Sequence, residues 1–237
     1  MKKKDQLIIF GTGQHAKVCI DNIEDQGKYK IFGLVTNKKD EVNKSVNGHK
    51  IVCLDNDIKK LISENKDIKN YFLGFGPSSG SMQKRFDMYT KLDKILNPVN
   101  IIHPLSLISK YSKIGKGNVI EAYAKICNNV ILGNHCLISS FSCINHDQQI
   151  SDNVFISGHV GLTGTSVGFG TIISEGAIVG LKKKIGKNCL IAENSLVNRN
   201  ILDNTLVTGN PPKLIKINKK ILKMLSSTLM KTISNTK

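Results

Sequence analysis

Two adjacent residues, His146 and Asp147, have the side-chain types that proton transfer requires. A neutral imidazole can accept a proton from an attacking amine or hydroxyl, and a neighbouring carboxylate can orient the ring and raise its basicity. A lone His–Asp pair on a protein surface is ordinarily a solvated pair without a catalytic role. Its chemical meaning therefore depends on the elements that hold it.

A second candidate site lies near the N-terminus, where Gly11 and Gly13 begin a G-x-G-x-x-A turn after a short apolar run. Such glycines let the backbone approach a phosphate at the start of a helix, and His15 and Lys17 follow directly. The range 36–37 is Thr-Asn where an NAD-binding domain usually has an acidic residue. We therefore favour the phosphate of a nucleotide-linked sugar here. An NAD(P) site and a plain strand–helix turn without a ligand are the alternatives.

The His–Asp pair falls inside a six-residue repeat that occupies the second half of the chain. A helix would repeat at roughly 3.6 residues and a half-buried strand at about 2. A period of six is typical of β-helix solenoids, and it predicts a triangular prism of about five coils from the vicinity of Ile102 to Val197. After one five-residue step the series resumes at Val167, and its sixteen aliphatic positions are Ile108, Ile114, Ile120, Ile126, Leu132, Ile138, Ile144, Ile150, Ile156, Leu162, Val167, Ile173, Val179, Ile185, Ile191 and Val197.

Small residues and glycines mark the predicted corners of this prism. Gly115, Gly133, Gly168 and Gly186 directly follow interior positions, where a tight corner favours a residue without Cβ. His146 lies two residues past an interior aliphatic position. We therefore expect its imidazole on a corner or outer face of the solenoid.

In residues 1–98, expected strands alternate with expected helices, and this pattern predicts a small parallel α/β domain. Residues 99–213 then form the solenoid, and residues 214–237, apolar among lysines, predict a C-terminal helix that caps the last coil. The expected strands of the first domain are 7–10, 31–35, 50–53 and 71–76, and its expected helices are 17–26, 57–64 and 81–92.

Composition excludes several classes of function for this 237-residue chain. The net charge of +16 is carried almost entirely by lysine, with Arg85 and Arg199 as the arginines. Aromatic residues for base stacking are few, so we expect no nucleic-acid partner. No apolar stretch approaches the roughly 18–20 residues of a membrane span, and the first apolar run is too short for a signal peptide. Six cysteines without a C-x-x-C pair fit a reducing compartment, which predicts a cytoplasmic protein.

These features together resemble a known family, the left-handed β-helix acyltransferases. More narrowly, the chain resembles the group with an N-terminal Rossmann-like domain, the sialic acid O-acetyltransferase and bacterial UDP-amino-sugar N-acetyltransferase branch. The similarity covers roughly residues 6 to 213. It rests on the hexad series and on Ile9-Phe10-Gly11-Thr12-Gly13-Gln14-His15-Ala16-Lys17, Phe72-Leu73-Gly74-Phe75-Gly76, His103-Pro104, Asn145-His146-Asp147, Leu162-Thr163-Gly164 and Gly209-Asn210-Pro211-Pro212-Lys213.

The resemblance implies an assembly and a mechanism. Solenoids of such enzymes form homotrimers, with acetyl-CoA in the groove between neighbouring subunits. By resemblance, His146 is the general base and Asp147 its partner, and a backbone N–H near Gly164 contacts the thioester. No metal is needed, because a base and a polarised carbonyl suffice.

The resemblance also places ligands along the chain. Ser174, Ala192 and Lys213 are candidates along the CoA arm, and the sugar's phosphates would lie near the glycine turn with His15 and Lys17. Relatives commonly have an asparagine near the sugar seven residues before the catalytic histidine, and here that position is Ser139.

The resulting hypothesis is an acetyl-CoA-dependent acetyltransferase acting on the amine of a nucleotide-linked deoxy amino sugar for bacterial surface glycans. O-acetylation of a sialic-acid-like sugar and a purely structural trimeric solenoid are the alternatives. A zinc enzyme built on His103, His135 and His159 is disfavoured, because their spacing does not match the close histidine pair of the γ-class carbonic anhydrases.

Overall fold

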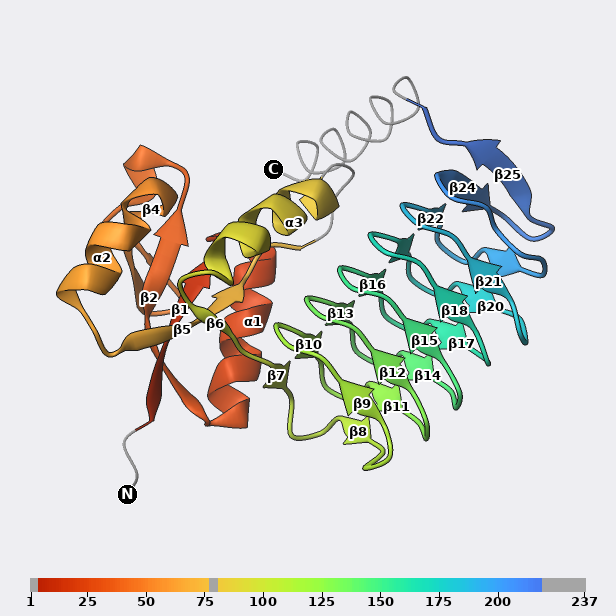
Figure 1. Cartoon of the computed structure of the whole chain (residues 1–237), viewed down its shortest axis with the longest axis horizontal. Helices are drawn as coiled ribbons and strands as arrows, with labels where there is room; N and C mark the ends of the chain where they lie inside the picture. The colour runs from red at the N-terminus through yellow and green to blue at the C-terminus, as the bar shows by residue number, and fades with distance from the viewer. Residues whose placement is uncertain (1–3, 77–80, 219–237) are drawn as a thin grey trace.

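A computed structural model describes residues 4–76 and 81–218 of the chain. It consists of an N-terminal α/β domain beside a long triangular solenoid (Figure 1). The α/β sheet has the order β3-β4-β2-β1-β5-β6 and is parallel except for the β3–β4 pair. Its elements are β1 Asp5–Phe10, α1 Gln14–Gln26, β2 Tyr29–Thr36, η1 Lys39–Glu41, β3 Ser45–Val46, β4 His49–Leu54, η2 Asp55–Asp57, α2 Ile58–Glu64, β5 Ile68–Leu73, α3 Ser81–Leu92 and β6 Asn97–Pro98.

Helices cover both faces of this sheet because alternate residues of its strands point to opposite sides. Leu7 and Ile9 of β1 pack with Ala16, Cys19 and Ile20 of α1 on one side. On the other side, Ile8 and Phe10 pack with apolar residues of α2 and α3. Each predicted strand and helix of the first domain is present, but β5 ends at Leu73, so residues 74–76 of the predicted strand 71–76 lie in the loop after it. The short elements η1, β3, η2 and β6 are additions.

From β7 to β23 the solenoid is built from strands of two residues that stack in register every eighteen or seventeen residues, and the four-residue β24 follows β22 at a spacing of sixteen. Face 1 contains β7 Ile101–Ile102, β10 Val119–Ile120, β13 Leu137–Ile138, β16 Phe155–Ile156, β19 Ile172–Ile173, β22 Leu190–Ile191 and β24 Thr205–Thr208. Face 2 contains β8 Leu107–Ile108, β11 Lys125–Ile126, β14 Cys143–Ile144, β17 Gly161–Leu162, β20 Ile178–Val179 and β23 Leu196–Val197. Face 3 contains β9 Lys113–Ile114, β12 Ile131–Leu132, β15 Gln149–Ile150, β18 Ser166–Val167 and β21 Lys184–Ile185.

The hexad aliphatics fill the interior of the prism, as their spacing predicts. Each lies over its counterpart in the next coil, as Ile126, Ile144 and Leu162 do on face 2. From Ile120 to Val197 these positions are buried and form one continuous cluster. The predicted parallel β-helix is thereby confirmed, and β24 on face 1 continues it beyond Val197.

Glycines stand at the corner between faces 3 and 1 because the next coil leaves no room for a Cβ. A Cβ at Gly133 would lie 2.3 Å from Asp152 Oδ1 and 2.7 Å from the Asp152 backbone nitrogen. By contrast, nothing lies within 4 Å of the Cβ position of Gly161 on face 2. The role of these glycines is therefore steric.

Replacing Gly133 with alanine should destabilise the solenoid by about 1–3 kcal/mol, because the added methyl group forces two coils apart. Gly161→Ala is the matched control, because its methyl group meets open space. The free energy of unfolding of both variants can be measured by urea denaturation. Equal stabilities for the two variants would contradict the steric explanation.

The N-terminal domain packs on face 1 of the solenoid and on the two corners beside it. The outward residues Ile101, Val119 and Leu137 belong to the same apolar cluster as α1. At the corner between faces 3 and 1, His135 stacks on Tyr89 with ring centroids 3.9 Å apart. At the corner between faces 1 and 2, His103 Nε2 lies 2.9 Å from an oxygen of Asp25. The corner between faces 2 and 3 is therefore the one that this domain leaves uncovered.

The solenoid ends in a short antiparallel pair formed by β24 and β25 (Lys213–Lys216). Residues 214–216, which the sequence assigned to a C-terminal helix, are thus part of a strand. Residues 219–237, where the rest of that helix was expected, lie outside the described residues. Within the described parts of the chain, no helix is both long and apolar enough to cross a membrane.

Candidate functional site

His146 and Asp147 form a hydrogen-bonded pair on the uncovered corner, between β14 and β15. Nδ1 of His146 lies 2.7 Å from a carboxylate oxygen of Asp147, and the two side chains are 65% and 61% exposed. The hydrogen bond to His146, and a second one from Asn129, lower the pKa of Asp147 below its ordinary value. A neutral imidazole that donates its Nδ1–H to this carboxylate presents the Nε2 lone pair outward. The pair can therefore accept a proton from a group bound against this corner.

The backbone at Asp147 holds the pair in place. Asp147 has φ 58°, the left-handed conformation that Asp and Asn tolerate better than most residues. Its N–H donates to the Asn128 carbonyl at 3.1 Å, and Asn129 Nδ2 donates to its carboxylate at 3.0 Å. The coil before the pair therefore fixes both its backbone and its acid group.

The coil after the pair contains the five-residue step, at residues 163–166. Asn145 Nδ2 donates to Thr163 Oγ1 at 3.3 Å, and the Thr165 N–H donates to Oε1 of the fully buried Gln148 at 3.2 Å. The residues that flank the His–Asp pair therefore also hold this shortened turn.

Gly164 stands in this turn directly over His146, because Ile144 pairs with Leu162 in the next coil. It has φ 55°, and it places no side chain over the imidazole. Among the described residues, no hydrogen-bond acceptor is found for its backbone N–H. A free N–H beside an outward imidazole is the arrangement that could polarise a bound carbonyl oxygen.

Three other predicted residues lie on a different corner. Ser139, Ser174 and Ala192 each follow a face 1 strand, and the strand register stacks them at the corner between faces 1 and 2. His146 and Gly164 lie at the opposite edge of face 2. A single chain therefore does not bring these two groups together. Lys213 is exposed at the start of β25, beyond the last coil.

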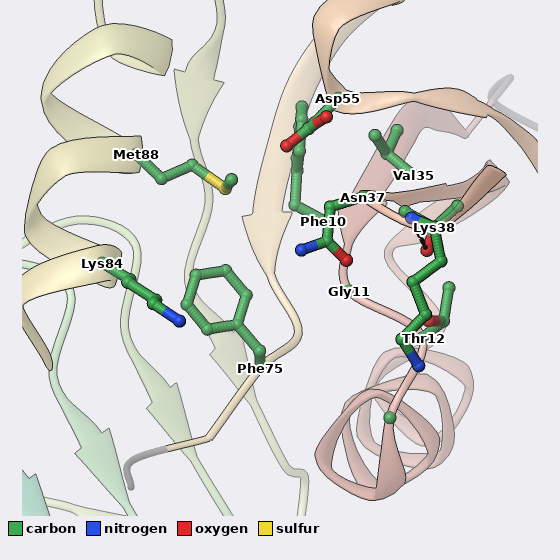
Figure 2. A pocket seen from close by; sticks show the side chains of 12 residues that line it. Phe10, Gly11, Thr12, Val35, Asn37, Lys38, Asp55, Phe75, Lys84 and Met88 are labelled. Atoms are coloured by element: carbon green, nitrogen blue, oxygen red, sulfur yellow. Dashed lines mark hydrogen bonds between the residues drawn. The ribbon is translucent and has the colours of Figure 1, made fainter. Parts of the chain in front are cut away.

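The glycine turn of the N-terminal domain lines a cavity of about 280 Å³ at the carboxyl ends of β1 and β2 (Figure 2). Gly11 and Gly13 line it. His15 and Lys17 do not line it. Lys17 is exposed on α1, while His15 is mostly buried and its Nε2 has no hydrogen-bond partner among the described residues. Burial, with the nearby Arg85 charge as a second cause, lowers the pKa of His15 to about 4, so its ring is neutral at pH 7.

An acidic residue does approach this turn, although none directly follows β2. Glu41 of η1 folds back and accepts hydrogen bonds from Thr36 at 2.7 Å, from Thr12 at 2.5 Å and from Lys38 at 2.8 Å. These hydrogen bonds, the one from Lys38 being the largest cause, lower the pKa of Glu41 to about 2. Glu41 therefore holds the glycine turn against the end of β2, and its oxygens are already engaged by the protein.

Glu41→Gln should lower the melting temperature at pH 7 by about 2–4 °C, because a charged acceptor of three hydrogen bonds is lost. The pKa of Glu41 is lower in the folded than in the unfolded state, so its contribution exists above the unfolded value and disappears as the pH falls toward about 2. The gap between wild type and variant should therefore shrink below about pH 4.5. Asp40→Asn, at an exposed neighbouring carboxylate, is the control. A gap that does not change with pH would contradict this role.

Several cavity residues were not among the site residues predicted from the sequence. Asn37, Asp55, Phe75, Lys84 and Met88 line the cavity from four different elements or loops. They share no motif, and only the parallel order of the sheet brings the ends of β2, β4 and β5 together. Strand ends were the one available signal, since ligands of open α/β sheets bind beyond the carboxyl ends of strands.

The three competing histidines do not converge on one point. His103 pairs with Asp25, His135 with Asp93, and His159 packs against the ring of Phe141. No group of three or more potential metal-ligating side chains occurs among the residues that the structure describes.

One segment in each domain matches a family model. Residues 6–91 match the PglD N-terminal domain. Residues 111–146 match the bacterial transferase hexapeptide model of six repeats. The chain joins a PglD-type N-terminal domain to a hexapeptide-repeat domain. The resemblance found in the sequence is thus confirmed for each domain.

Solved structures share this two-domain fold over most of the chain. A variant of perosamine N-acetyltransferase from Caulobacter crescentus, in complex with CoA and GDP-perosamine, is 24% identical with a TM-score of 0.81, covering 91% of this chain and 98% of that one. The acetyltransferase domain of PglB from Neisseria gonorrhoeae, in complex with acetyl coenzyme A, is 21% identical with a TM-score of 0.79, covering 90% and 100%. WeeI from Acinetobacter baumannii is 14% identical with a TM-score of 0.59, covering 88% and 99%. No curated protein matches this chain by sequence.

Proposed function

We propose that this protein is an acetyl-CoA-dependent N-acetyltransferase that modifies the amine of a nucleotide-linked deoxy amino sugar. The observation that carries the proposal is the hydrogen-bonded His146–Asp147 pair beneath the open N–H of Gly164, on a chain that also has a cavity at its glycine turn. The shared fold with acetyltransferases whose complexes hold CoA, acetyl-CoA and GDP-perosamine supports it. Surface glycan synthesis in bacteria, in the cytoplasm, is the expected setting.

The proposed reaction uses the imidazole twice. Nε2 of His146 accepts a proton as the sugar amine attacks the thioester carbonyl, while Asp147 stabilises the imidazolium that forms. The Gly164 N–H donates to the oxyanion of the tetrahedral intermediate. The carbon–sulfur bond then breaks, and the imidazolium returns its proton to the departing thiolate. The products are an N-acetyl sugar and CoA with a free thiol.

The proposed donor lies along face 2, whose two edges present different candidates. Gly164 contacts the thioester end, and Ser174, Ala192 and Lys213 contact the CoA arm. Ser139 lies on the edge away from His146 and faces the sugar. The phosphates of the acceptor lie at Gly11 and Gly13, which line the cavity. His15 and Lys17 are secondary candidates, because neither lines the cavity in this structure.

Neighbouring subunits of a homotrimer would share each active site. His146 lies on the corner opposite face 1, whereas the domain with the glycine-turn cavity packs on face 1 and its flanking corners. The body of the solenoid separates the two within one chain. A neighbouring copy brings its own glycine-turn cavity to each imidazole. It also brings its own corner between faces 1 and 2, where Ser139 lies. The site is complete only in such an assembly.

The direct test measures CoA release with acetyl-CoA and a panel of nucleotide-linked amino sugars. We expect turnover and a product in which NMR locates the acetyl group on nitrogen. An O-acetyl product would show that the acceptor group is a hydroxyl and not an amine. Failure of millimolar acetyl-CoA to raise the melting temperature would instead favour a structural solenoid.

A further inference from the structure

The glycine-turn cavity continues into a second hollow between α2 and α3. The second hollow has a volume of about 620 Å³, and the two share Phe10, Asn37, Asp55, Lys84 and Met88 in their walls. The phosphate-binding turn is at one end of this continuous groove, and the shared residues form its middle. A nucleotide whose phosphates lie at the turn would therefore place its base among these shared residues.

The walls of the glycine-turn cavity, which include this middle part, are apolar on one side and polar on the other (Figure 2). Phe75 and Met88 present an apolar surface on one side, with Lys84 beside them. Asn37 and Asp55 stand across the cavity. A flat heteroaromatic ring fits such a space, because its face can lie on apolar side chains while its edge meets polar ones.

The polar side offers a free carboxylate. Within residues 4–76 and 81–218, the structure shows no side-chain hydrogen bond or ion pair for Asp55 or for Asn37. Glu41, the other acidic group near the turn, is fully engaged with Thr12, Thr36 and Lys38. Asp87, which lines the second hollow, accepts a hydrogen bond from Gln83 at 2.8 Å. Among the described residues that both hollows share, Asp55 is therefore the carboxylate that no protein group engages.

Nucleobases differ in how they can meet a carboxylate. The pairing edge of guanine carries two adjacent donors, N1–H and the 2-amino group, next to the O6 acceptor. Uracil has one donor between two carbonyl oxygens, and adenine and cytosine each have an acceptor beside their single amino donor. A carboxylate accepts only, so it can form two parallel hydrogen bonds with guanine alone. Against uracil it would oppose a carbonyl oxygen.

We propose that this groove selects a guanine nucleotide, with Asp55 accepting from guanine N1–H and the 2-amino group and Asn37 or Lys84 donating to O6. This inference rests on the proposed function and deepens it, because it specifies the nucleotide of the acceptor. The ring lies on Phe75 and Met88, and the diphosphate extends to Gly11 and Gly13. Asn37 alone could pair with uracil, and the unpaired Asp55 beside it disfavours that alternative.

Calorimetric titration of the full-length protein with GDP, UDP, ADP and CDP tests the selection without requiring catalysis. We expect GDP to bind at least about tenfold more tightly than UDP, since a buried polar group left unpaired is costly. Asp55→Asn should weaken GDP binding by roughly 10- to 100-fold while leaving UDP binding no weaker. Asp57→Asn, two residues away and outside the cavity walls, is the matched control and should keep the preference.

Equal or tighter binding of UDP, a GDP preference that survives Asp55→Asn, or no nucleotide binding at all would each overturn the selection. Acetyl transfer distinguishes this failure from failure of the proposed function. Turnover of a UDP-linked amino sugar, with UDP bound at least as tightly as GDP, would contradict guanine selection but support the acetyltransferase function. A clear GDP preference without CoA release from any amino sugar would support guanine selection and contradict the acetyltransferase function.

Discussion

His146→Ala should lower kcat by about 10²- to 10⁴-fold, the contribution typical of a positioned general base. The loss follows because the amine must shed its proton as it attacks the thioester, and Asp147 faces the imidazole, not the substrate. CoA release at saturating acetyl-CoA and sugar measures the effect on kcat. The His146 side chain is 65% exposed, so the fold should be unaffected.

His49→Ala is the matched control for this prediction. His49 also forms an imidazole–carboxylate pair, with its Nε2 3.0 Å from an oxygen of Glu24, but it lies on β4 of the N-terminal domain and lines neither hollow of the groove. We expect the control to retain most of its turnover. The melting-temperature increase caused by acetyl-CoA should persist in His146→Ala, which would show that the donor still binds. Turnover of His146→Ala close to that of wild type would refute its role as base.

Two inactive variants should restore each other's activity when they assemble together. His146→Ala removes the proposed base, and Gly13→Phe fills the proposed phosphate-binding turn. The second change is compatible with the fold, because nothing lies within 4 Å of a Cβ at Gly13 and its φ of −78° suits any residue. Each mixed trimer has one interface in three that pairs an intact imidazole with an intact cavity, so the mixed oligomers should recover about one third of wild-type activity. Co-expression with two affinity tags, followed by purification through both, isolates the mixed oligomers.

The physical basis is that the imidazole and the N-terminal domain lie on opposite sides of one solenoid. A chain carrying both substitutions, co-assembled with His146→Ala, is the control and should stay inactive, because no imidazole is present. Mixed oligomers that remain as inactive as their parents would show that each chain uses its own cavity, and the shared site would be wrong.

The aliphatic repeat alone was sufficient to predict the solenoid and its interior. A stacked coil buries the same position in every turn, so Ile126, Ile144 and Leu162 carry the register in their spacing. The same logic placed His146 on a corner, two residues past an interior position. Gly133 was predictable for the same reason, since only a glycine fits where neighbouring coils nearly touch.

The contacts that turn these positions into a site depend on distant parts of the chain. Which of the three corners stays uncovered is decided by the packing of α1 and α3 on face 1, and no local pattern encodes that choice. Glu41 reaches Thr12 across 29 residues, so the acid near the glycine turn was invisible to a search directly after β2. Asp55 and Met88 line the same cavity only because the sheet places the ends of separate strands beside α3. Periodic burial is a local property that spacing records, whereas convergence of side chains at a site is a property of the packed chain.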